Sequence, residues 1–595
     1  MTAAGARPGE RPPKAAADAC DLVVLGSGAG GMTAALVAAL DGLRPLLVEA
    51  SGRIGGTTAL SSGTVWIPGN RHQHALGMRD DPQAARTYLD ALVGARADPA
   101  LREAFLSAGP AMIDDLHERT DVRFRAYATS PDYRQDLPGA AQGGRPLEPL
   151  PFDGRTLGAH FDELRWPLRE LMLFGGMMVT RGEAVQLLRA LRSAKAFVLG
   201  ARLVLRFARD RLRHARGTRL VLGNALAARL YRNLLERGVP VLRGARTVRL
   251  HREGGRVTGL DLATSEGERR IVARHGVVLA GGGFPASAPL RERYLPHPVA
   301  EHTAACESCT GSTLVLAQAV GATLGPSGED NALWFPSSIA RRDDGSTAVY
   351  PHIALDRSKP GLVAVNASGR RFVDEAVSYH EFVRAMYRSH RSVPTIPAVL
   401  VCDRRFVWKY GLGLIRPRTP SLAPFVRRGY LFVADTLGAL ARQVGVDPAG
   451  LAATVKTNND DALRGVDSAF GKGSTSYDRC NGDPGHAPNP CLGPIERAPF
   501  CAVRVHPTPL GTSLGLATDA SARVLDARGR PIDGLYAVGN DMHSVMGGEY
   551  PGPGAQIGIA MTFGWLAAKH AAGAAAPITP DPASAGSAAA ARSPT

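Results

Sequence analysis

Short apolar runs alternate with segments of helical spacing along most of the chain. Near the start, Leu22 to Leu25 is predicted to be a short buried strand, and the alanine-rich segment Thr33 to Leu40 a helix. A second apolar run, Pro45 to Val48, is predicted to be another strand. This order of strand, helix and strand is typical of an α/β fold that binds a dinucleotide.

Apolar residues at helical spacing predict further helices. They cover Asp81 to Gly94, Pro99 to Glu118, Glu183 to Leu212 and Gly223 to Arg237. Apolar runs between glycine turns then predict short strands. These are Val239 to Leu242, Ala245 to Leu250, Arg256 to Asp261 and Val277 to Ala280, the last leading into Gly281-Gly282-Gly283.

The pattern changes after Gly325, where strands with interleaved turns alternate with a few helices. The predicted strands are Leu362 to Asn366, Arg371 to Val373 and Val399 to Asp403. Near the C-terminus the chain again shows the strand-turn-helix pattern of its first part. A predicted buried strand covers Gly534 to Asn540, and a glycine-rich turn joins it to a predicted helix over Gln556 to His570. We therefore expect an α+β segment inserted into the α/β fold.

The turn after the first strand carries glycines at the spacing of a dinucleotide fingerprint, Gly26, Gly28 and Gly31. The first permits a tight turn, the second lets the backbone approach a pyrophosphate, and the third allows the helix to pack on the strand. Ala29 and Gly30 complete the helix N-terminus, where phosphate charge is favourable. The motif predicts a dinucleotide site, against the plainer alternative of a glycine-rich turn.

Glu49 ends the second strand, 21 residues past Gly28. A carboxylate at this position accepts hydrogen bonds from the adenosine ribose and argues against a 2′-phosphate. The fingerprint alone leaves NAD and FAD as alternatives.

The next run decides between NAD and FAD. It reads Arg53-Ile54-Gly55-Gly56-Thr57-Thr58-Ala59-Leu60-Ser61-Ser62-Gly63. Its small residues and hydroxyls suit a flavin that reaches inward. The run resembles the fumarate reductase and succinate dehydrogenase flavoprotein superfamily, in which FAD lies extended along such a segment. The resemblance implies FAD as the cofactor. It implies cofactor contacts from Gly56, Thr57, Thr58, Ser62 and Gly63, and from Gly539, Asn540, Gln556 and Ile557 near the C-terminus.

The resemblance also implies the architecture, an α/β Rossmann-like FAD-binding domain that is split in the sequence and holds an inserted α+β catalytic or cap domain. We place the first part of the FAD-binding domain at residues 20–325, the catalytic domain at 326–504, and the second part at 505–572. Residues 1–19 and 573–595 are rich in alanine and proline, and we expect them to be disordered.

The composition, with 45% hydrophobic and 21% charged residues, is that of a soluble globular protein. The net charge of +16 is mostly spread along the chain, so we expect no nucleic-acid partner. An exception is a predicted basic amphipathic helix with arginines three or four residues apart. It is either a solvated face or a peripheral membrane contact, and its arginines are Arg202, Arg206, Arg209, Arg213 and Arg216.

The seven cysteines are scattered, which argues against a secreted disulfide framework and for a cytoplasmic location, with membrane association as the alternative. Cys306 and Cys309 form the only close pair. Because neither a second pair nor a histidine cluster is placed to complete a metal site, we expect ordinary thiols and no bound metal.

The C-terminal motif narrows the resemblance within the superfamily. A fumarate-type enzyme carries a clamp histidine in a run that is Gly511-Thr512-Ser513-Leu514-Gly515 here, so dicarboxylate chemistry is not expected. The run Met546 to Gly554, which ends in Tyr-Pro-Gly-Pro-Gly, resembles instead the 3-ketosteroid Δ1-dehydrogenases. Three other stretches agree, namely Thr57 to Asn70, the loop from Asp132-Tyr133 to Arg155, and Gly369 to Tyr379.

This resemblance implies roles for four residues. Tyr379 is the base that removes a proton next to the ketone, and Tyr133 stabilises its phenolate or relays its proton. The Tyr550 hydroxyl and the Gly554 backbone N–H form an oxyanion hole for the enolate. A tyrosine with a pKa of about 10 is a poor base at neutral pH, so Tyr379 needs such a neighbour.

The implied reaction puts a double bond between C1 and C2 of a 3-ketosteroid or a similar hydrophobic ketone, with a quinone-like or artificial electron acceptor. His543 and Glu549 depart from the family pattern and could alter the ring system that is accepted. The alternatives are a Δ4-(5α)-dehydrogenase, another FAD-dependent enone reductase or dehydrogenase, and a non-catalytic flavin-binding protein.

Overall fold

The computed structural model describes residues 18–573 except 79, 188–192 and 354–355. The first strand, β1, begins at Asp18, so two residues of the N-terminal segment that we expected to be disordered belong to a strand. Residues 1–17 and 574–595, which hold the rest of that segment and nearly all of the predicted tail, lie outside the described residues.

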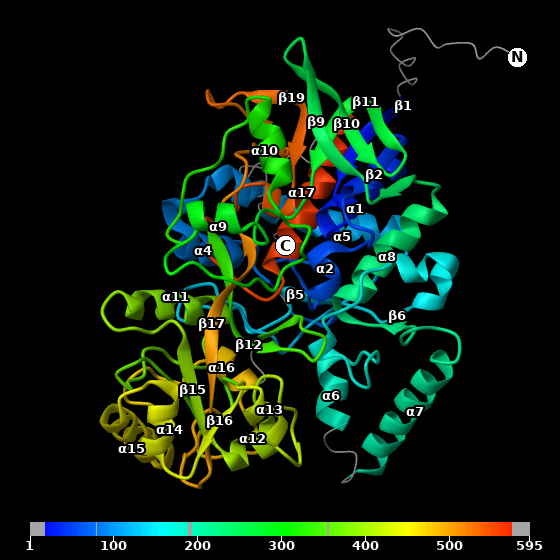
Figure 1. Cartoon of the computed structure of the whole chain (residues 1–595). Helices are drawn as coiled ribbons and strands as arrows, with labels where there is room; N and C mark the ends of the chain where they lie inside the picture. The colour runs from blue at the N-terminus through cyan, green and yellow to red at the C-terminus, as the bar shows by residue number, and fades with distance from the viewer. Residues whose placement is uncertain (1–17, 79, 188–192, 354–355, 574–595) are drawn as a thin grey trace, which may run out of the picture.

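A mixed eight-stranded sheet forms the upper half of Figure 1. Its central strands are parallel, because β1 pairs with β2 on one side and with β11 on the other, and β11 pairs with β19. β19 comes from near the C-terminus, so the sheet combines the two ends of the chain. The main path runs β18 (Arg523–Leu525), β19 (Pro531–Ala537), β11 (Gly267–Leu279), β1 (Asp18–Leu25), β2 (Pro45–Glu49) and β8 (Val241–Arg243), and β11 also pairs with β10 (Arg256–Thr264), which pairs with β9 (Arg246–Glu253).

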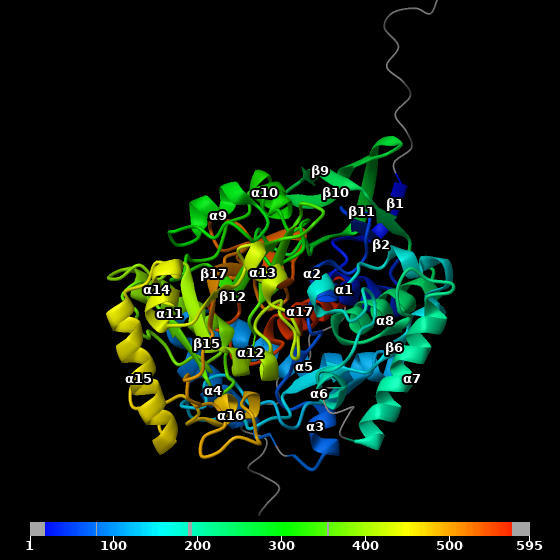
Figure 2. The same cartoon turned by 60° about the horizontal axis from the view of Figure 1, so that its bottom comes forward.

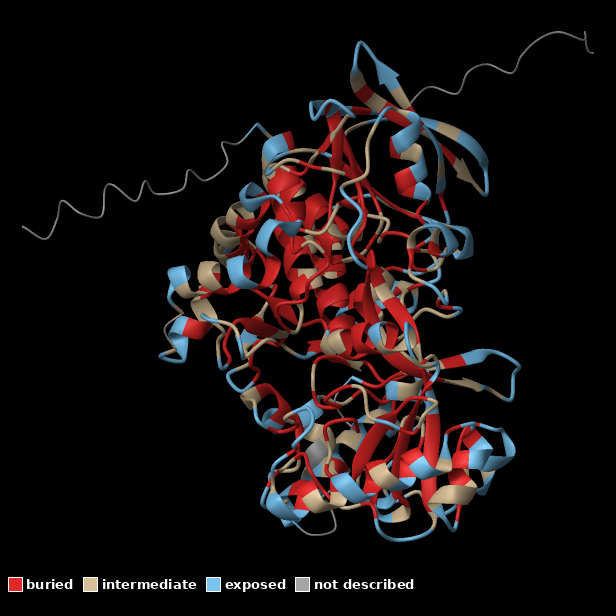
Figure 3. Cartoon of the chain, turned by 90° about the vertical axis from the view of Figure 1, so that its left-hand side faces the viewer, coloured by how far each residue is buried: buried red, intermediate tan, exposed pale blue. Residues whose placement is uncertain are grey.

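Two helices from opposite ends of the chain, α1 (Ala29–Leu40) and α17 (Ala555–Ala571), pack closely beside this sheet. A Cβ on Gly30 of α1 would lie 2.8 Å from the Ala560 carbonyl oxygen of α17, and one on Gly564 would lie 2.4 Å from the Gly30 oxygen. Glycine is therefore needed on both sides of the contact. Buried residues concentrate in this region and in the lower sheet (Figure 3).

The lower half of Figure 1 contains an antiparallel six-stranded sheet. Its long central strand, β17 (Phe500–Thr512), pairs with β12 and β15, and reaches from the lower sheet to the upper half. The path is β13 (Thr347–Pro351), β12 (Ala332–Arg341), β17, β15 (Ala398–Asp403) and β14 (Leu362–Val365), and β16 (Phe432–Ala434) also pairs with β17. The helices α14 (Leu437–Val444) and α15 (Pro448–Arg464) cover it with a second apolar cluster.

Shorter elements connect the two sheets. A three-stranded sheet contains β3 (Val65–Trp66), β4 (Phe124–Ala126) and β5 (Pro146–Pro149), and a two-stranded one contains β6 (Phe152–Asp153) and β7 (Arg219–Leu220). The remaining α-helices are α2 (Gly56–Leu60), α3 (Arg71–Ala75), α4 (Pro82–Val93), α5 (Pro99–Arg119), α6 (Arg181–Leu187), α7 (Ala194–Asp210), α8 (Leu222–Glu236), α9 (Ala288–Tyr294), α10 (Ser312–Ala319), α11 (Tyr379–His390), α12 (Arg404–Tyr410), α13 (Ala423–Arg427) and α16 (Ser476–Asn481).

Most predicted elements agree with these bounds to within a few residues, and three differ. The strand predicted at Val277 to Ala280 is the end of the longer β11, which begins at Gly267. The helix predicted over Glu183 to Leu212 is described as α6 and α7, with residues 188–192 outside the described residues. The strand predicted at Arg371 to Val373 is wrong, because Arg371 makes only an isolated bridge to Val365. Its guanidinium binds Glu375 and Asp467 instead, which keeps this segment in a loop.

α7 lies at the edge of the molecule, apart from both sheets (Figure 2). It ends at Asp210, before Arg213 and Arg216 of the predicted basic helix. Arg216 is buried and contacts the rings of Phe161 and Trp166, so it does not belong to the basic face. None of the described helices combines the length and the apolar character needed to cross a membrane.

Candidate active site

In the glycine turn after β1, the fold itself requires glycine at Gly26 and Gly31 but not at Gly28. Gly26 has a φ of 114°, and a Cβ there would lie 2.2 Å from the Ala280 oxygen. A Cβ on Gly31 would lie 2.0 Å from the Gly26 oxygen. At Gly28 the nearest atom to a Cβ would be Thr58 Oγ1 at 3.8 Å. The space beside Gly28 is therefore left by the chain, as close approach of a pyrophosphate requires.

The N-terminus of α1 faces this space. Its N-cap, Gly28, offers no side chain to the free N–H groups, and the first turn contains no acidic residue. The Ala29 N–H donates to Thr58 Oγ1 at 2.9 Å, which fixes α2 beside the turn. A buried helix N-terminus whose N-cap residue has no side chain favours an anion, so Gly28 to Gly31 fit a phosphate group.

Glu49 lies at the end of β2, where the sequence places it, and is buried. Its carboxylate accepts hydrogen bonds from the Ser27 N–H at 3.0 Å and hydroxyl at 2.5 Å, and from the Ser51 N–H at 2.8 Å. The Ser27 hydroxyl in turn accepts from the Gly55 N–H at 2.9 Å. Ser27, which the motif left unassigned, thus connects the carboxylate to the segment with Gly56, Thr57 and Thr58.

The predicted cofactor segment, residues 53–63, continues with further hydroxyl side chains. Thr57 Oγ1 accepts from the Cys306 N–H at 3.0 Å, and the hydroxyls of Ser62 and Thr64 lie 3.0 Å apart. Gly63 has a φ of 66°, and a Cβ there would lie 2.6 Å from the Gly223 nitrogen, so this glycine serves packing against α8.

Asp541 connects the second glycine turn, Gly281 to Gly283, to the segment that contains Gly539 and Asn540. Its carboxylate accepts from the Gly281 N–H at 2.6 Å and the Gly283 N–H at 2.8 Å, and burial raises its pKa. The preceding residues, Gly539 and Asn540, start the same short 3₁₀ turn. Sequence reasoning missed Asp541, although its position directly after the Gly539-Asn540 pair was a signal.

A chain of side-chain amides connects the predicted cofactor contacts to the predicted chemistry. Asn540 Nδ2 donates to Gln556 Oε1 at 3.2 Å, and Gln556 Nε2 donates to the Tyr550 hydroxyl oxygen at 3.3 Å. Gln556 and the half-buried Ile557 lie in the first turn of α17, directly after its N-cap, Gly554. The Gly554 N–H is among the N–H groups that this helix leaves without an intrahelical partner.

The three predicted tyrosines form one buried cluster. The Tyr133 hydroxyl donates to the Tyr379 oxygen at 2.8 Å. The ring of Tyr550 lies 5.4 Å from that of Tyr133 and 5.5 Å from that of Tyr379, between ring centroids. They come from three distant segments, since Tyr133 lies between β4 and β5, Tyr379 starts α11, and Tyr550 precedes α17.

Burial raises the pKa of all three tyrosines above 10, and for Tyr133 and Tyr379 well above it. Each is therefore a neutral phenol at pH 7. This state suits Tyr550 as a hydrogen-bond donor and opposes Tyr379 as a base. The contact with Tyr133 adds to that cost, because it too raises the pKa of Tyr379, contrary to the predicted stabilisation of the phenolate.

A buried ion-pair network fixes the loop that carries Tyr133. Arg145 binds Asp132 at 2.6 Å and Asp80 at 2.9 Å, and all three side chains are almost fully buried. Asp132 also accepts from Trp66 Nε1 at 2.8 Å. Because a buried carboxylate without its partner costs about 3–5 kcal/mol, these contacts hold the residue next to Tyr133 in one place. Arg145 was not predicted.

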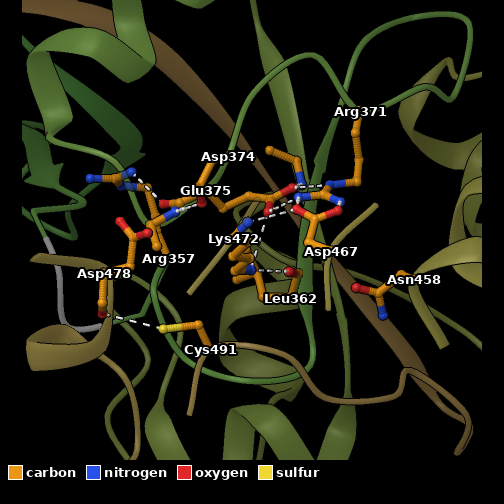
Figure 4. A network of polar contacts seen from close by, with 12 residues as sticks. Arg357, Leu362, Arg371, Asp374, Glu375, Asn458, Asp467, Lys472, Asp478 and Cys491 are labelled. Atoms are coloured by element: carbon orange, nitrogen blue, oxygen red, sulfur yellow. Dashed lines mark hydrogen bonds and ion pairs between the residues drawn. The ribbon is translucent and has the colours of Figure 1, made fainter. Parts of the chain in front are cut away.

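A second network fixes the loop that leads into Tyr379. The Glu375 carboxylate binds Arg371 at 2.8 Å and Lys472 at 3.1 Å, while Arg357 donates to the Glu375 carbonyl oxygen at 2.7 Å (Figure 4). Beside them, burial raises the pKa of Asp374 to about 8. α11 then starts at Tyr379, with the Ser378 side chain as its cap.

Tyr477 of α16 is a fourth member of the tyrosine cluster, which the sequence motifs did not indicate. Its ring centroid lies 5.0 Å from that of Tyr133. Burial raises its pKa, whereas the positive charge of Arg357 acts in the opposite direction.

A cavity brings one predicted catalytic residue together with predicted cofactor residues of the C-terminal segment, whereas Tyr133, Tyr379 and Gly554 are not part of its lining. Tyr550, Asn540 and Gln556 all line it. His543 also lines it, and burial lowers the pKa of this histidine to about 4, so that it is neutral at pH 7. Glu549, at the same wall, binds Arg384 at 2.9 Å. The other lining residues are Leu333, Thr512, Gly539, Met542, Ser544, Met546, Ala555 and Ile559.

The sequence is similar to those of known flavin-binding proteins, in agreement with the candidate cofactor site. Residues 21–557 match the family described as "FAD binding domain". The chain therefore belongs to this family of FAD-binding flavoproteins, and FAD as the predicted cofactor is confirmed. Within the described part of the chain, no group of three or more histidine, cysteine or acidic side chains could hold a metal ion.

Individual relatives are similar over nearly the whole chain. The 3-oxosteroid 1-dehydrogenase of Mycobacterium tuberculosis (strain ATCC 25618 / H37Rv) is 38% identical, over 93% of this chain and 98% of the relative. The 4-oxocyclohex-2-ene-1-carboxylate 5-dehydrogenase of Sinomonas cyclohexanicum is 36% identical, over 93% and 94%. A crystal structure of 3-ketosteroid Δ1-dehydrogenase from Sterolibacterium denitrificans, in complex with 1,4-androstadiene-3,17-dione, is 38% identical with a TM-score of 0.88, over 93% and 100%. The resemblance drawn from the motifs is thereby confirmed.

We expect Gly28→Ala to fold normally and to bind FAD at least about tenfold more weakly, a difference of roughly 1.4 kcal/mol. A Cβ there meets no chain atom closer than 3.8 Å, so only the approach of the ligand is obstructed. Flavin absorbance per protein and titration of the apoprotein with FAD measure the effect. Gly52→Ala, where a Cβ meets nothing within 4 Å, is the control and should keep its flavin. Unchanged affinity in Gly28→Ala would show that the fingerprint is misread.

Proposed function

We propose that this protein is an FAD-dependent 3-oxosteroid 1-dehydrogenase, which introduces the C1–C2 double bond into 3-ketosteroids. The observation that carries the proposal is the buried cluster of Tyr133, Tyr379 and Tyr550, of which Tyr550 shares a cavity wall with Asn540 and Gln556. The names of the relatives support the same reaction.

In the proposed mechanism the ketone oxygen lies at Tyr550. Because the Tyr550 oxygen accepts from Gln556, its own proton is free to be donated to the ketone. The Gly554 N–H would supply a second donor, and together they would lower the cost of the enolate that forms when a C2 proton leaves. FAD, held by Gly28 to Gly31, Glu49 and the segment with Thr57 and Thr58, would supply the acceptor for the hydride from C1.

Tyr379 would take the C2 proton in this mechanism. Its hydroxyl contacts Tyr133, and the Tyr133 ring contacts Tyr477, so the proton can be shared with a neighbouring phenol. The four rings also exclude water, which keeps the enolate from being protonated again by solvent.

The lining of the cavity favours a steroid over the other ring system in the relatives' names. A 4-oxocyclohexene carboxylate carries a negative charge, and none of the described residues that line the cavity is a lysine or an arginine. His543 is neutral there, and the charge of Glu549 is paired with Arg384. Leu333, Met542 and Ile559 suit an uncharged, apolar ketone instead.

Several finer points are part of the proposal. The parallel strands β2, β1, β11 and β19 support a Rossmann-like FAD-binding domain assembled from residues 20–325 and 505–572, around a catalytic domain at 326–504. The cofactor and catalytic residues named above, the quinone-like acceptor and the cytoplasmic location also stay predictions.

Tyr379→Phe should slow flavin reduction by androst-4-ene-3,17-dione at least about 100-fold while steroid binding survives, because only the proton acceptor is lost. Tyr550→Phe should weaken both binding and rate, since its hydroxyl meets the ketone in the ground state and the enolate in the transition state. Anaerobic stopped-flow reduction and spectral titration separate the two effects. The expected product is the 1,4-diene.

Tyr350→Phe provides the control, because Tyr350 of β13 contacts His352 and none of the proposed catalytic tyrosines. Near-normal turnover in Tyr379→Phe would refute the mechanism. Formation of a 4-ene from a saturated 3-ketone, with no 1,4-diene, would move the assignment to the Δ4 alternative. Failure of every ketone to reduce the flavin would favour a non-catalytic protein.

We also propose that α7 contacts an anionic membrane surface, from which a water-insoluble steroid could reach the enzyme. Phe197 and Leu205 are 59% and 70% exposed on one side of α7, and Arg202, Arg206 and Arg209 follow the neighbouring side at helical spacing. An apolar stripe beside a basic one is the pattern of a helix that lies in a membrane interface.

The protein should sediment with liposomes that contain anionic lipid, and less so at high salt, because salt screens the arginines. Leu205→Asp should abolish sedimentation. Leu463→Asp is the matched control, since Leu463 is 78% exposed on α15, at the opposite flank in Figure 2. Equal recovery in the supernatant with and without liposomes would remove the proposal.

A further inference from the structure

Cys306 and Cys309 lie at the two ends of a tight turn that the proposed mechanism does not use. The Cys309 N–H donates to the Cys306 carbonyl oxygen at 3.1 Å, which closes a β-turn. In such a turn the first and fourth Cα atoms lie less than about 7 Å apart. Disulfide-bonded cysteines have Cα separations of roughly 4.4–6.8 Å, so the backbone already brings this pair within bridging range.

The two thiols are buried, and their pKa values are shifted in opposite directions. The neighbouring Cys309 thiol and the nearby Arg165 guanidinium hold the pKa of Cys306 below its usual value. The Cys306 thiol and burial raise the pKa of Cys309. Cys306 also lies 3.1 Å from the Ser308 hydroxyl. An attacking thiol of low pKa beside a resolving thiol is the arrangement of a reversible disulfide.

The turn reaches the surface between the two cysteines. Glu307, between the two cysteines, and Thr310, directly after Cys309, are exposed, so the buried thiol of Cys306 is one residue away from the surface. All the cysteines are free thiols, and the other five are not paired in a turn of this kind within the described residues.

On its inner side the pair touches two segments of the candidate FAD site. Thr57 Oγ1 accepts from the Cys306 N–H at 3.0 Å and lies 3.5 Å from Cys309 Sγ. A Cβ on Gly282, in the second glycine turn, would lie 2.7 Å from Cys309 Sγ. Movement of the Cys309 sulfur therefore acts on both segments.

We propose that Cys306 and Cys309 are a redox modification site, which exchanges with low-molecular-weight disulfides and loosens FAD when it is oxidised. The Cys306 thiolate attacks one sulfur of the external disulfide, and the other sulfur leaves as a thiol after taking up a proton. Cys309 then attacks Cys306, releases the second thiol and passes on its proton. Two protein thiols are oxidised to one disulfide, and the external disulfide is reduced to two thiols.

Closing the bond brings the two sulfurs to about 2.05 Å and removes the Cys309 S–H, so that Cys309 can no longer donate to Thr57 Oγ1, 3.5 Å away. The segment that contains Thr57 then loses one of its contacts. A loss equal to one hydrogen bond weakens the binding of FAD by about tenfold. The thiol chemistry does not depend on the proposed steroid reaction, whereas the effect on FAD rests on the cofactor site described above.

The holoprotein is incubated with oxidised glutathione, and free thiols are then alkylated and mapped by mass spectrometry. The peptide with Cys306 and Cys309 should lose two hydrogens and resist alkylation. In Cys309→Ser, Cys306 should instead keep one glutathione, because the resolving thiol is missing. Cys480→Ser, which removes an exposed and unpaired thiol, is the control and should behave like the unmodified chain.

FAD release is followed by the rise in flavin fluorescence after dilution. Oxidised wild-type protein should release FAD about tenfold faster than reduced protein, and Cys306→Ser should not respond to the oxidant. Alkylation of both cysteines after exposure to oxidised glutathione, or a Cys309→Ser protein without an adduct on Cys306, would overturn the redox site. A disulfide that forms without any change in FAD release would overturn its coupling to the cofactor.

Discussion

The candidate site depends on the burial of several tyrosine hydroxyls against one another. A buried hydroxyl without a hydrogen-bond partner is costly, so Tyr133, Tyr379 and Tyr550 must satisfy each other or nearby amides. The same burial keeps them protonated, because a phenolate is poorly solvated there. One constraint thus makes Tyr550 a good donor to an enolate and makes Tyr379 a base that needs assistance.

The rest of the structure keeps these rings together. Arg145 with its two carboxylates holds the loop before Tyr133, and the ion pairs of Glu375 hold the loop before Tyr379. Tyr550 is held through the next residue in the chain, since the Tyr133 N–H and the Tyr88 hydroxyl both donate to the Pro551 oxygen. Three separate segments are therefore fixed by charge and backbone contacts before any substrate arrives.

Much of this arrangement could be predicted from the sequence, and the reason is local. The glycine turn, Glu49 and the last helix depend on short patterns whose geometry is fixed within a few residues. Arg145 and Tyr477 could not be found in that way, because each acts on a partner outside its own local pattern, whereas Asp541 directly follows the predicted Gly539-Asn540 pair. The expected strand at Arg371 is wrong, and the Arg371 side chain instead pairs with Glu375 and with the distant Asp467.

The most direct test of the central claim is the pH dependence of flavin reduction by a 3-ketosteroid, measured by stopped flow without oxygen. Since burial holds the pKa of Tyr379 well above 10, the reactive phenolate fraction should grow with pH. The rate should rise about tenfold per pH unit up to at least about pH 10, and this rise should vanish in Tyr379→Phe. A rate that levels off near pH 8, where Asp374 titrates, with the same profile in Tyr379→Phe, would contradict the account.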